Sequence, residues 1–464
     1  MQTQKTDETA SPSQHAPLWG VVEGFYGRPW TAGQRESLCA WMKGQGLNAY
    51  LYAPKDDLKH RALWHAAYTR DEARALKRLI AHCDRLGVRF IYGIAPGLST
   101  RWTPKQVESL LLRKVESVRR LGCRSFALMF DDIPSKGAAQ YLRRYGSWVN
   151  AHVAWSRHVI EGISKRQPDA RFLFCPTPYC GSFAGDVAQN TYLRTIGEDL
   201  PNAVDILWTG SDIIAPSIGL AEIRAVARVL RRPPTIWDNW FANDYDLRRL
   251  HLGPYAKRDP RVRREVRGIL INPNTEFRAN DVPFHTFASF VRGGGGWSEE
   301  SAYRDALDQW RPQFRDCRGA LPTRKELRTL TDCLHLPFAS GKLAAKLLRD
   351  LPSALASTTS AGHAARARIR KTARALLQWQ TRITELRDRE LSYTLYRHVW
   401  ELKEEMDLFQ RYFDWMESAT ARRSAFRSPF HQVGTYRGGF VASLQRHLEL
   451  AAAGGFRPAT RPVS

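Results

Sequence analysis

"SFALMFDDIP", residues 125–134, is an apolar run that ends in two adjacent carboxylates and a proline. A short uninterrupted apolar run is typical of a buried strand. Charged side chains at the end of such a strand cost folding free energy unless they are paired with other groups, so their presence calls for an explanation. Asp131 and Asp132 allow two interpretations. Aspartate often terminates a strand and caps the next helix, and paired carboxylates also serve acid–base catalysis.

Seven further apolar runs predict strands that alternate with amphipathic, helix-like segments. They are LWGVVEG (18–24), AYLYAPK (49–55), VRFIYGIAPG (88–97), RFLFCPTPY (171–179), VDILWTGS (204–211), PTIWDNW (234–240) and GILINPN (268–274). The first helix is expected to begin at Thr31. Strands alternating with helices predict a parallel sheet, and eight strands favour an α/β fold of the (β/α)₈ TIM barrel type over a six-stranded doubly wound sheet. We assign this barrel to residues 17–292.

Polar side chains stand at the C-terminal ends of five predicted strands, where a barrel of this kind builds its active site. They are Lys55, Asp131, Asp132, Tyr179, Asn239 and Asn272. Each alone is an ordinary strand-end residue. Together on one rim, they predict a functional site.

The cysteine content and the N-terminal segment indicate a cytoplasmic protein. Residues 1–16 are polar and lack the apolar stretch of a secretory signal, so we expect a disordered tail. Seven cysteines, an odd number without framework spacing, indicate reduced thiols. No apolar run has the length of a membrane span, and a membrane is not an expected partner.

The formal net charge of +24 has two interpretations. It is compatible with binding to nucleic acid, an anionic surface or an acidic substrate, and also with arginine-rich codon usage alone. The basic residues are dispersed and no recognition motif frames them. We therefore favour codon usage and do not expect nucleic acid as a partner.

"RGGGGW", residues 292–297, marks the expected end of the barrel, and residues 297–464 predict a C-terminal helical bundle domain. Apolar residues there recur at alternating steps of four and three, which places them on one stripe of a helix. The stripe comprises Leu395, Val399, Leu402, Met406, Phe409, Phe413 and Met416. We favour a face buried within one chain, because the run is short for a coiled coil; the seam of a homodimer is the alternative.

The adjacency of the two aspartates favours one type of glycoside hydrolysis. Neighbouring carboxylates repel each other, so one of them is expected to hold a proton near neutral pH. The usual schemes place two carboxylates on opposite faces of a sugar ring, which adjacent residues cannot do. In the substrate-assisted variant, the 2-acetamido oxygen of the sugar attacks C1, and both carboxylates act close together.

Nearby polar and aromatic residues fit this chemistry. The Tyr179 hydroxyl is suited to donate to an acetamide oxygen, and Trp237 to pack against an acetyl methyl. Asn239 and Asp244 offer hydrogen bonds to amide and hydroxyl groups.

Seven motifs from about Leu18 to the glycine-rich boundary resemble the catalytic domain of glycoside hydrolase family 84. They are GVVEGFYGRPW (20–30), YLYAPKDDLKHR (50–61), CRSFALMFDDI (123–133), FCPTPYCG (174–181), LWTG (207–210), WDNWFANDYD (237–246) and NPNTEF (272–277). That family comprises β-N-acetylglucosaminidases, including protein O-GlcNAcases and enzymes once called hyaluronidases. The resemblance implies a retaining hydrolase of terminal β-linked N-acetylglucosamine on glycoconjugates, with O-GlcNAc proteins among the candidate substrates, and no metal or cofactor.

The resemblance also implies a role for each site residue. Asp131 orients and polarises the acetamido group, and Asp132 is the general acid and later the base. The residues implied to surround the N-acetyl group are Tyr179, Trp237 and Asn239. Those implied to hold the sugar hydroxyls are Gly24, through its backbone carbonyl, Lys55, Asp244 and Asn272.

Two other functions compete with this interpretation. In the first, the aspartates are ligands of a metal-dependent transferase, but no His-rich ligand set or phosphate-binding glycine loop accompanies them. In the second, the barrel is an inactive scaffold and the basic segment 363–382 binds nucleic acid or another polyanion. A decayed enzyme is expected to have lost a carboxylate or the tyrosine, and both aspartates and Tyr179 are present.

Overall fold

The computed structural model describes residues 16–98, 102–133, 139–294, 296–356, 359–418, 424–429, 431 and 438–459. The tail expected over residues 1–16 lies, except for Ala16, outside the described residues. The chain forms two compact units, one of residues 1–240 and 257–275 and the other of residues 241–256 and 276–464. Each unit has its own hydrophobic core.

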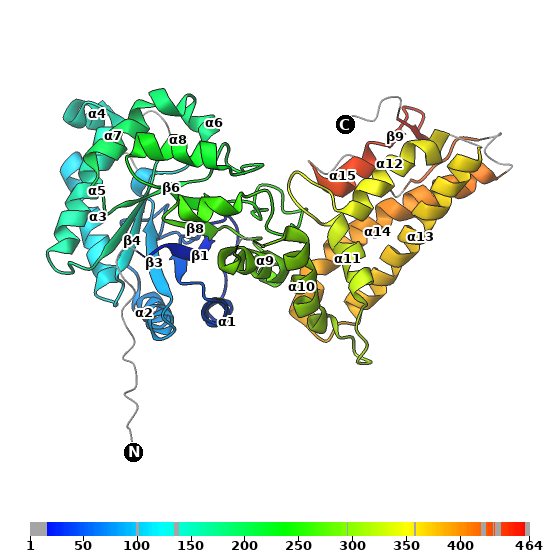
Figure 1. Ribbon diagram of the computed structural model, residues 1–464, viewed down its shortest axis with the longest axis horizontal. Coiled ribbons are helices and arrows are strands. Elements are labelled where there is room, and N and C mark those ends of the chain that lie inside the picture. Colours follow the sequence, from blue (N-terminus) through cyan, green and yellow to red (C-terminus); the bar gives the residue numbers. More distant parts are fainter. Residues whose placement is uncertain are drawn as a thin grey trace, which may run out of the picture. The chain divides into compact units, whose positions relative to one another are not determined.

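Eight parallel strands of the first unit close into a barrel in sequence order, with β8 pairing to β1 (Figure 1). The strands are β1 (Leu18–Glu23), β2 (Ala49–Tyr52), β3 (Arg89–Ile94), β4 (Ser125–Met129), β5 (Arg171–Cys175), β6 (Asp205–Trp208), β7 (Thr235–Asp238) and β8 (Gly268–Ile271). Closure aligns Leu18 with Gly268 and Val21 with Ile271. Buried apolar side chains such as Val22, Leu51 and Leu173 form one core cluster. The predicted (β/α)₈ barrel is confirmed.

Helices connect the strands and surround the barrel (Figure 1). They are α1 (Ala32–Gln45), α2 (Arg70–Arg85), α3 (Pro104–Arg119), α4 (Ala139–Tyr145), α5 (Trp148–Ser164), α6 (Gly181–Ala184), α7 (Thr191–Asp199) and α8 (Leu220–Leu230), with 3₁₀ turns η1 (Pro96–Leu98), η2 (Val187–Gln189) and η3 (Pro260–Arg264). Thr31, Thr69 and Thr103 each cap a helix in a reciprocal capping box. The predicted start of α1 at Thr31 is confirmed.

The second unit is mainly helical, as predicted. Its elements are η4 (Phe277–Ala279), α9 (Asp281–Arg292), α10 (Glu299–Trp310), η5 (Arg311–Phe314), α11 (Arg324–Cys333), α12 (Lys342–Ala356), α13 (Ser360–Thr384), α14 (Arg389–Glu417), α15 (Gly439–Gln445), β9 (Leu448–Leu450) and β10 (Phe456–Pro458). The antiparallel pair β9–β10 is an exception that the helical pattern did not predict.

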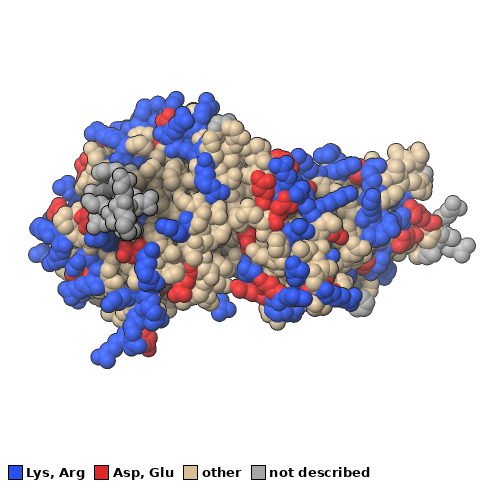
Figure 2. Space-filling model, turned by 60° about the horizontal axis from the view of Figure 1, so that its bottom comes forward, with Lys and Arg blue, Asp and Glu red and all other residues tan. Residues whose placement is uncertain are grey.

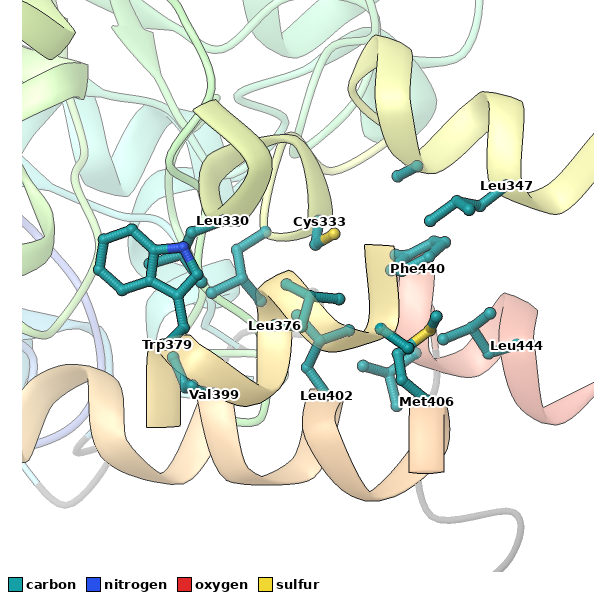
Figure 3. Packing of buried hydrophobic residues seen from close by; sticks show 14 of the residues in the cluster. Leu330, Cys333, Leu347, Leu376, Trp379, Val399, Leu402, Met406, Phe440 and Leu444 are labelled. Carbon is teal, nitrogen blue, oxygen red and sulfur yellow. The ribbon is translucent and has the colours of Figure 1, made fainter. Parts of the chain in front are cut away.

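The predicted apolar stripe lies on α14 and forms part of the core of this unit. Six of its residues are buried and Met416 packs against them half-buried. Val399, Leu402 and Met406 lie beside Leu376 and Trp379 of α13 in Figure 3. The prediction that the stripe is buried within one chain is therefore confirmed.

The compact units divide the chain differently from the expected ranges. Residues 241–256 and α9 group with the C-terminal unit, although the expected barrel included both. The backbone explains the first difference: the Leu252 N–H donates to the Leu334 carbonyl at 2.8 Å and the Gly253 N–H to the His335 carbonyl at 2.7 Å. The second arises because α9 packs against α10.

Three properties that the sequence suggested can be followed in the structure: the state of the cysteines, the hydropathy of the helices and the distribution of charge. All seven cysteines are free, as the spacing predicted. Within the described ranges, no helix combines the length and the apolar character needed to cross a membrane. Lysine and arginine side chains are scattered among neutral and acidic ones on the face seen in Figure 2.

Candidate active site

All eight predicted residues that belong to the first unit contact another of them at the C-terminal ends of the barrel strands. Lys55 contacts Asp131, and Tyr179 contacts Asp132. A second group joins Gly24, Trp237, Asn239 and Asn272. All of these except Asp132 are buried, and the structure brings the eight residues together at one rim.

Asp131 is a buried carboxylate with a fixed countercharge. Its Oδ2 accepts from the Lys55 ammonium, and the two side chains are only 8% and 3% exposed. Burial by itself raises the pKa of Asp131, but the charges of Lys55 and Arg61 outweigh burial and lower the pKa below its ordinary value. Its buried Oδ1 has no hydrogen-bond partner among the described residues. Asp131 is therefore an ionised carboxylate, and its Oδ1 is available to accept a hydrogen bond.

Asp132 differs from its neighbour in exposure and backbone. Its side chain is exposed, and its φ of 50° lies in the left-handed region. Successive side chains of an extended strand point to opposite faces, whereas this turn lets both aspartates contact rim residues. The Tyr179 hydroxyl donates to Oδ1 at 2.8 Å, and the Tyr26 hydroxyl donates to Oδ2 at 2.9 Å.

The two tyrosines remain hydroxyl donors at neutral pH. Burial is the largest cause that raises the pKa of each, and the negative charge of Asp132 adds to it. Both oxygens of Asp132 are therefore fixed by neutral donors, in contrast to the ammonium that pairs with Asp131.

An amide network forms the other part of the rim. Trp237 Nε1 and Asn272 Nδ2 both donate to Asn239 Oδ1, at 2.8 and 2.9 Å. Asn239 Nδ2 donates to the Ile213 carbonyl at 2.7 Å, and the Gly24 N–H donates to Asn272 Oδ1 at 3.3 Å. The Lys55 Nζ lies 5.6 Å from the centroid of the Trp237 ring, which connects the two parts of the rim. These bonds hold the indole and both amides in fixed orientations.

Sequence reasoning did not single out Tyr26 and Arg61, which also contact the aspartates. Arg61 donates to the carbonyls of both, and Tyr26 donates to the Asp132 carboxylate. Each lies in a quoted motif, GVVEGFYGRPW or YLYAPKDDLKHR, beyond a strand end. Position after a strand was thus the available signal, but a tyrosine and an arginine in a loop have no distinctive pattern.

Asp244 is the predicted site residue that the first unit does not contain. It is half-buried and belongs to residues 241–256, which form part of the second unit. Its role as a ligand of sugar hydroxyls remains a prediction.

The groups on the rim supply proton transfer and hydrogen bonding. They comprise an ammonium, two carboxylates, tyrosine hydroxyls, an indole and amides. In the described part of the chain, no three His, Cys, Asp or Glu side chains form a group that could hold a metal ion.

Comparison with known proteins places these features in a family. Residues 19–326 match the family described as beta-N-acetylglucosaminidase. Protein O-GlcNAcase from Mus musculus is 44% identical over 277 residues, which are 59% of this chain and 30% of that protein. The Rattus norvegicus protein of the same name matches to the same extent. The chain thus spans about 30% of the length of these curated relatives.

A solved structure extends the likeness beyond the barrel. A mutant of the O-GlcNAc hydrolase from Thermobaculum terrenum matches with a TM-score of 0.77 and 26% identity, covering 88% of this chain and 86% of its own. The match to the family covers well over half of the chain, from the first strand through the barrel. The resemblance to glycoside hydrolase family 84 is thereby confirmed, and the chain belongs to the β-N-acetylglucosaminidase family of glycoside hydrolases.

Proposed function

We propose that this chain is a retaining β-N-acetylglucosaminidase that releases terminal N-acetylglucosamine from glycoconjugates by substrate-assisted catalysis. The observation that carries the proposal is the unequal environment of the adjacent aspartates. Asp131 is buried against an ammonium with one oxygen unpartnered, whereas Asp132 is exposed and held by two hydroxyls. O-GlcNAc proteins are the proposed substrates, because the mouse and rat relatives are protein O-GlcNAcases.

In the first step, the acetamide oxygen of the substrate attacks C1. Asp131 Oδ1 accepts the acetamide N–H and makes the oxygen more nucleophilic, while Lys55 keeps the carboxylate ionised. The bond between C1 and the leaving oxygen breaks as Asp132 gives that oxygen a proton. The products are an oxazoline that is still protonated on nitrogen and hydrogen-bonded there to Asp131, the free alcohol and an ionised Asp132.

In the second step, Asp132 takes a proton from water as the water oxygen attacks C1. The C1–oxygen bond of the protonated oxazoline opens, and the acetamide is restored with the N–H that it kept. Two inversions at C1 leave the product in the β configuration. The same carboxyl group thus acts as acid and then as base.

The remaining rim residues bind and orient the sugar in this proposal. Tyr179, Trp237 and Asn239 surround the N-acetyl group, and the indole packs against its methyl. The sugar hydroxyls are assigned to Gly24, Lys55, Asp244 and Asn272. Support comes from the hydrogen bonds that fix Trp237, Asn239 and Asn272 relative to one another.

A fluorinated substrate series tests the proposal. Fluorine on the acetyl methyl withdraws electrons from the amide oxygen, so turnover of an aryl N-acetyl-β-glucosaminide should fall with each added fluorine. The matched β-glucoside without an acetamide should be nearly inert. Release of the phenol, followed by absorbance, measures both. Equal rates across the series would indicate a nucleophile supplied by the enzyme.

Gly24→Ala should abolish most of the binding of the N-acetyl group. A Cβ at Gly24 would lie 2.1 Å from the Trp237 ring, so the indole must move from its bond with Asn239. Displacement of about 1 Å can cost about 10²-fold in rate, and we expect a fall in kcat/KM of at least that order. Steady-state kinetics on the aryl substrate measure it.

Gly33→Ala is the matched control for this change. Gly33 lies in α1, and a Cβ there meets no atom within 4 Å. Alanine in a helix should retain activity and add up to about 1 kcal/mol of stability. Wild-type kcat/KM in Gly24→Ala would show that the packing against Trp237 does not shape the site.

A reducing compartment such as the cytoplasm is proposed as the location. Seven free cysteines support it, because disulfides form readily in oxidising compartments. A homodimer remains a proposal.

A further inference from the structure

Arg61 is a buried cation to which the proposed mechanism gives no role. It lies in the segment between β2 and α2 and is 6% exposed. Nη2 donates to the Asp132 carbonyl at 2.7 Å, and Nη1 to the Asp131 carbonyl at 3.4 Å. Within the described residues, it forms no ion pair with a carboxylate. A buried guanidinium that faces carbonyls needs an explanation, because removing its charge from water is costly.

The two carbonyls belong to the peptide groups on either side of the Asp132 Cα. The orientation of these two groups determines φ and ψ of Asp132. A left-handed backbone at a residue other than glycine costs about 1–3 kcal/mol and persists only where its surroundings enforce it. The planar fork of the guanidinium contacts both groups at once and thereby holds the unusual φ of 50°.

The segment that carries Arg61 is itself fixed to the neighbouring strand. His60 Nδ1 bonds to the Gly93 carbonyl at 2.8 Å, and the Ala95 N–H donates to the His60 carbonyl at 2.9 Å. Gly93 belongs to β3, which pairs with β4, the strand that leads to the aspartates. Arg61 therefore holds Asp132 from a rigid support.

Arg61 also lies beside a group that contacts the Asp132 carboxylate. Its guanidinium carbon is 5.8 Å from the centroid of the Tyr26 ring, a cation–π distance. The hydroxyl of that tyrosine donates to Asp132 Oδ2. Backbone and side chain of Asp132 are thus both held by Arg61 or its immediate neighbour.

We infer that Arg61 is a positioning residue that holds Asp132 in the left-handed conformation from which its carboxyl reaches the leaving oxygen. The inference rests on the proposed function for its kinetic consequence. The backbone part can be tested independently of activity.

Lysine and glutamine at position 61 separate geometry from charge. Arg61→Lys keeps a positive charge but has no planar fork, and Arg61→Gln removes the charge. If Arg61 acts by positioning, both variants should lose activity to a similar extent. If it acts through its charge on Asp131, Arg61→Lys should retain most activity.

The kinetic test uses N-acetyl-β-glucosaminides whose leaving groups range from acidic phenols to alkyl alcohols. Alkyl glycosides need the acid, and we expect kcat/KM for them to fall about 10²-fold in both variants. Glycosides of acidic phenols should lose much less, so the dependence on leaving-group acidity becomes steeper. Affinity for a thiazoline analogue of the oxazoline, which needs no acid, should change little. The same two substitutions at Arg113, an exposed residue of α3, are the controls.

Uniform losses across all leaving groups, or wild-type kinetics in both variants, would overturn the inference. Crystal structures of the two variants supply the second readout. Asp132 should leave the left-handed region in Arg61→Gln, and retention of its φ in both variants would also refute the inference. If the unmodified enzyme hydrolyses no N-acetylglucosaminide while Asp132 moves in the variants, the proposed function fails and the backbone role of Arg61 stands. Arg61→Lys, the milder change, serves if Arg61→Gln does not fold.

Discussion

Asp132→Asn should divide substrates by how readily their leaving group departs. Glycosides of serine or of a sugar hydroxyl need a proton on the leaving oxygen, and general acid assistance contributes about 10²–10⁴-fold. Their turnover should fall by that order. The first step on a glycoside of an acidic phenol should be nearly unchanged, because the phenolate departs unprotonated. Rapid mixing should therefore reveal a burst of phenol before the slowed second step.

Asp132→Asn should affect the chemistry without disturbing the fold. Asparagine has nearly the shape of aspartate, and its oxygen can still accept from Tyr179 or Tyr26. The free energy of unfolding should change little, which chemical denaturation would check. Equal losses on every leaving group would contradict the assignment of Asp132 as the acid. Full activity would mean that Asp132 only terminates the strand and has no part in catalysis.

Asp131→Asn should slow all substrates, whatever their leaving group. The acetamide oxygen is the nucleophile in every first step. An asparagine cannot place a negative charge beside the acetamide N–H, and so it cannot make that oxygen equally nucleophilic. The loss should be comparable for alkyl and aryl glycosides. We expect it to be about 10²–10⁴-fold, the usual contribution of general acid–base assistance. Steady-state kcat/KM on both substrate classes measures the effect.

This substitution also changes stability, which must be separated from chemistry. Lys55 would remain buried without its partner, and a broken buried pair costs about 3–5 kcal/mol. The double variant Lys55→Met, Asp131→Asn removes the unpaired charge and should recover much of that free energy. Its activity should stay low. Recovery of activity together with stability would mean that Asp131 serves the fold and not the reaction.

Patterns within single segments were enough to predict the barrel and most of its rim. Each strand is a short apolar run between helical segments, so its identity is local, and barrel closure follows from the number of strands. The rim residues follow directly, because strand ends of a parallel barrel meet at one edge. Asp131 and Asp132 could therefore be placed from their position alone.

Contacts between distant segments could not be predicted in this way. Arg61 reaches Asp132 across 71 positions and Tyr26 reaches it across 106, and neither belongs to a periodic pattern. The left-handed backbone of Asp132 could not be predicted from the local sequence "FDDI" either, since aspartate adopts ordinary strand-end conformations more often. The division into compact units also depends on contacts between distant segments. Residues 241–256 group with the C-terminal unit through backbone bonds to residues 334 and 335.

The interleaving of the two units limits how such a chain can be rearranged in evolution. Residues 241–256, which lie between β7 and β8, belong to the helical unit, so the barrel is not a contiguous stretch of sequence. A single recombination point between the units would leave the Leu252 and Gly253 N–H groups without the carbonyls that accept them. Exchange of the helical unit for an unrelated domain therefore requires a coordinated change within the barrel sequence. The barrel and its helical unit are expected to be inherited together.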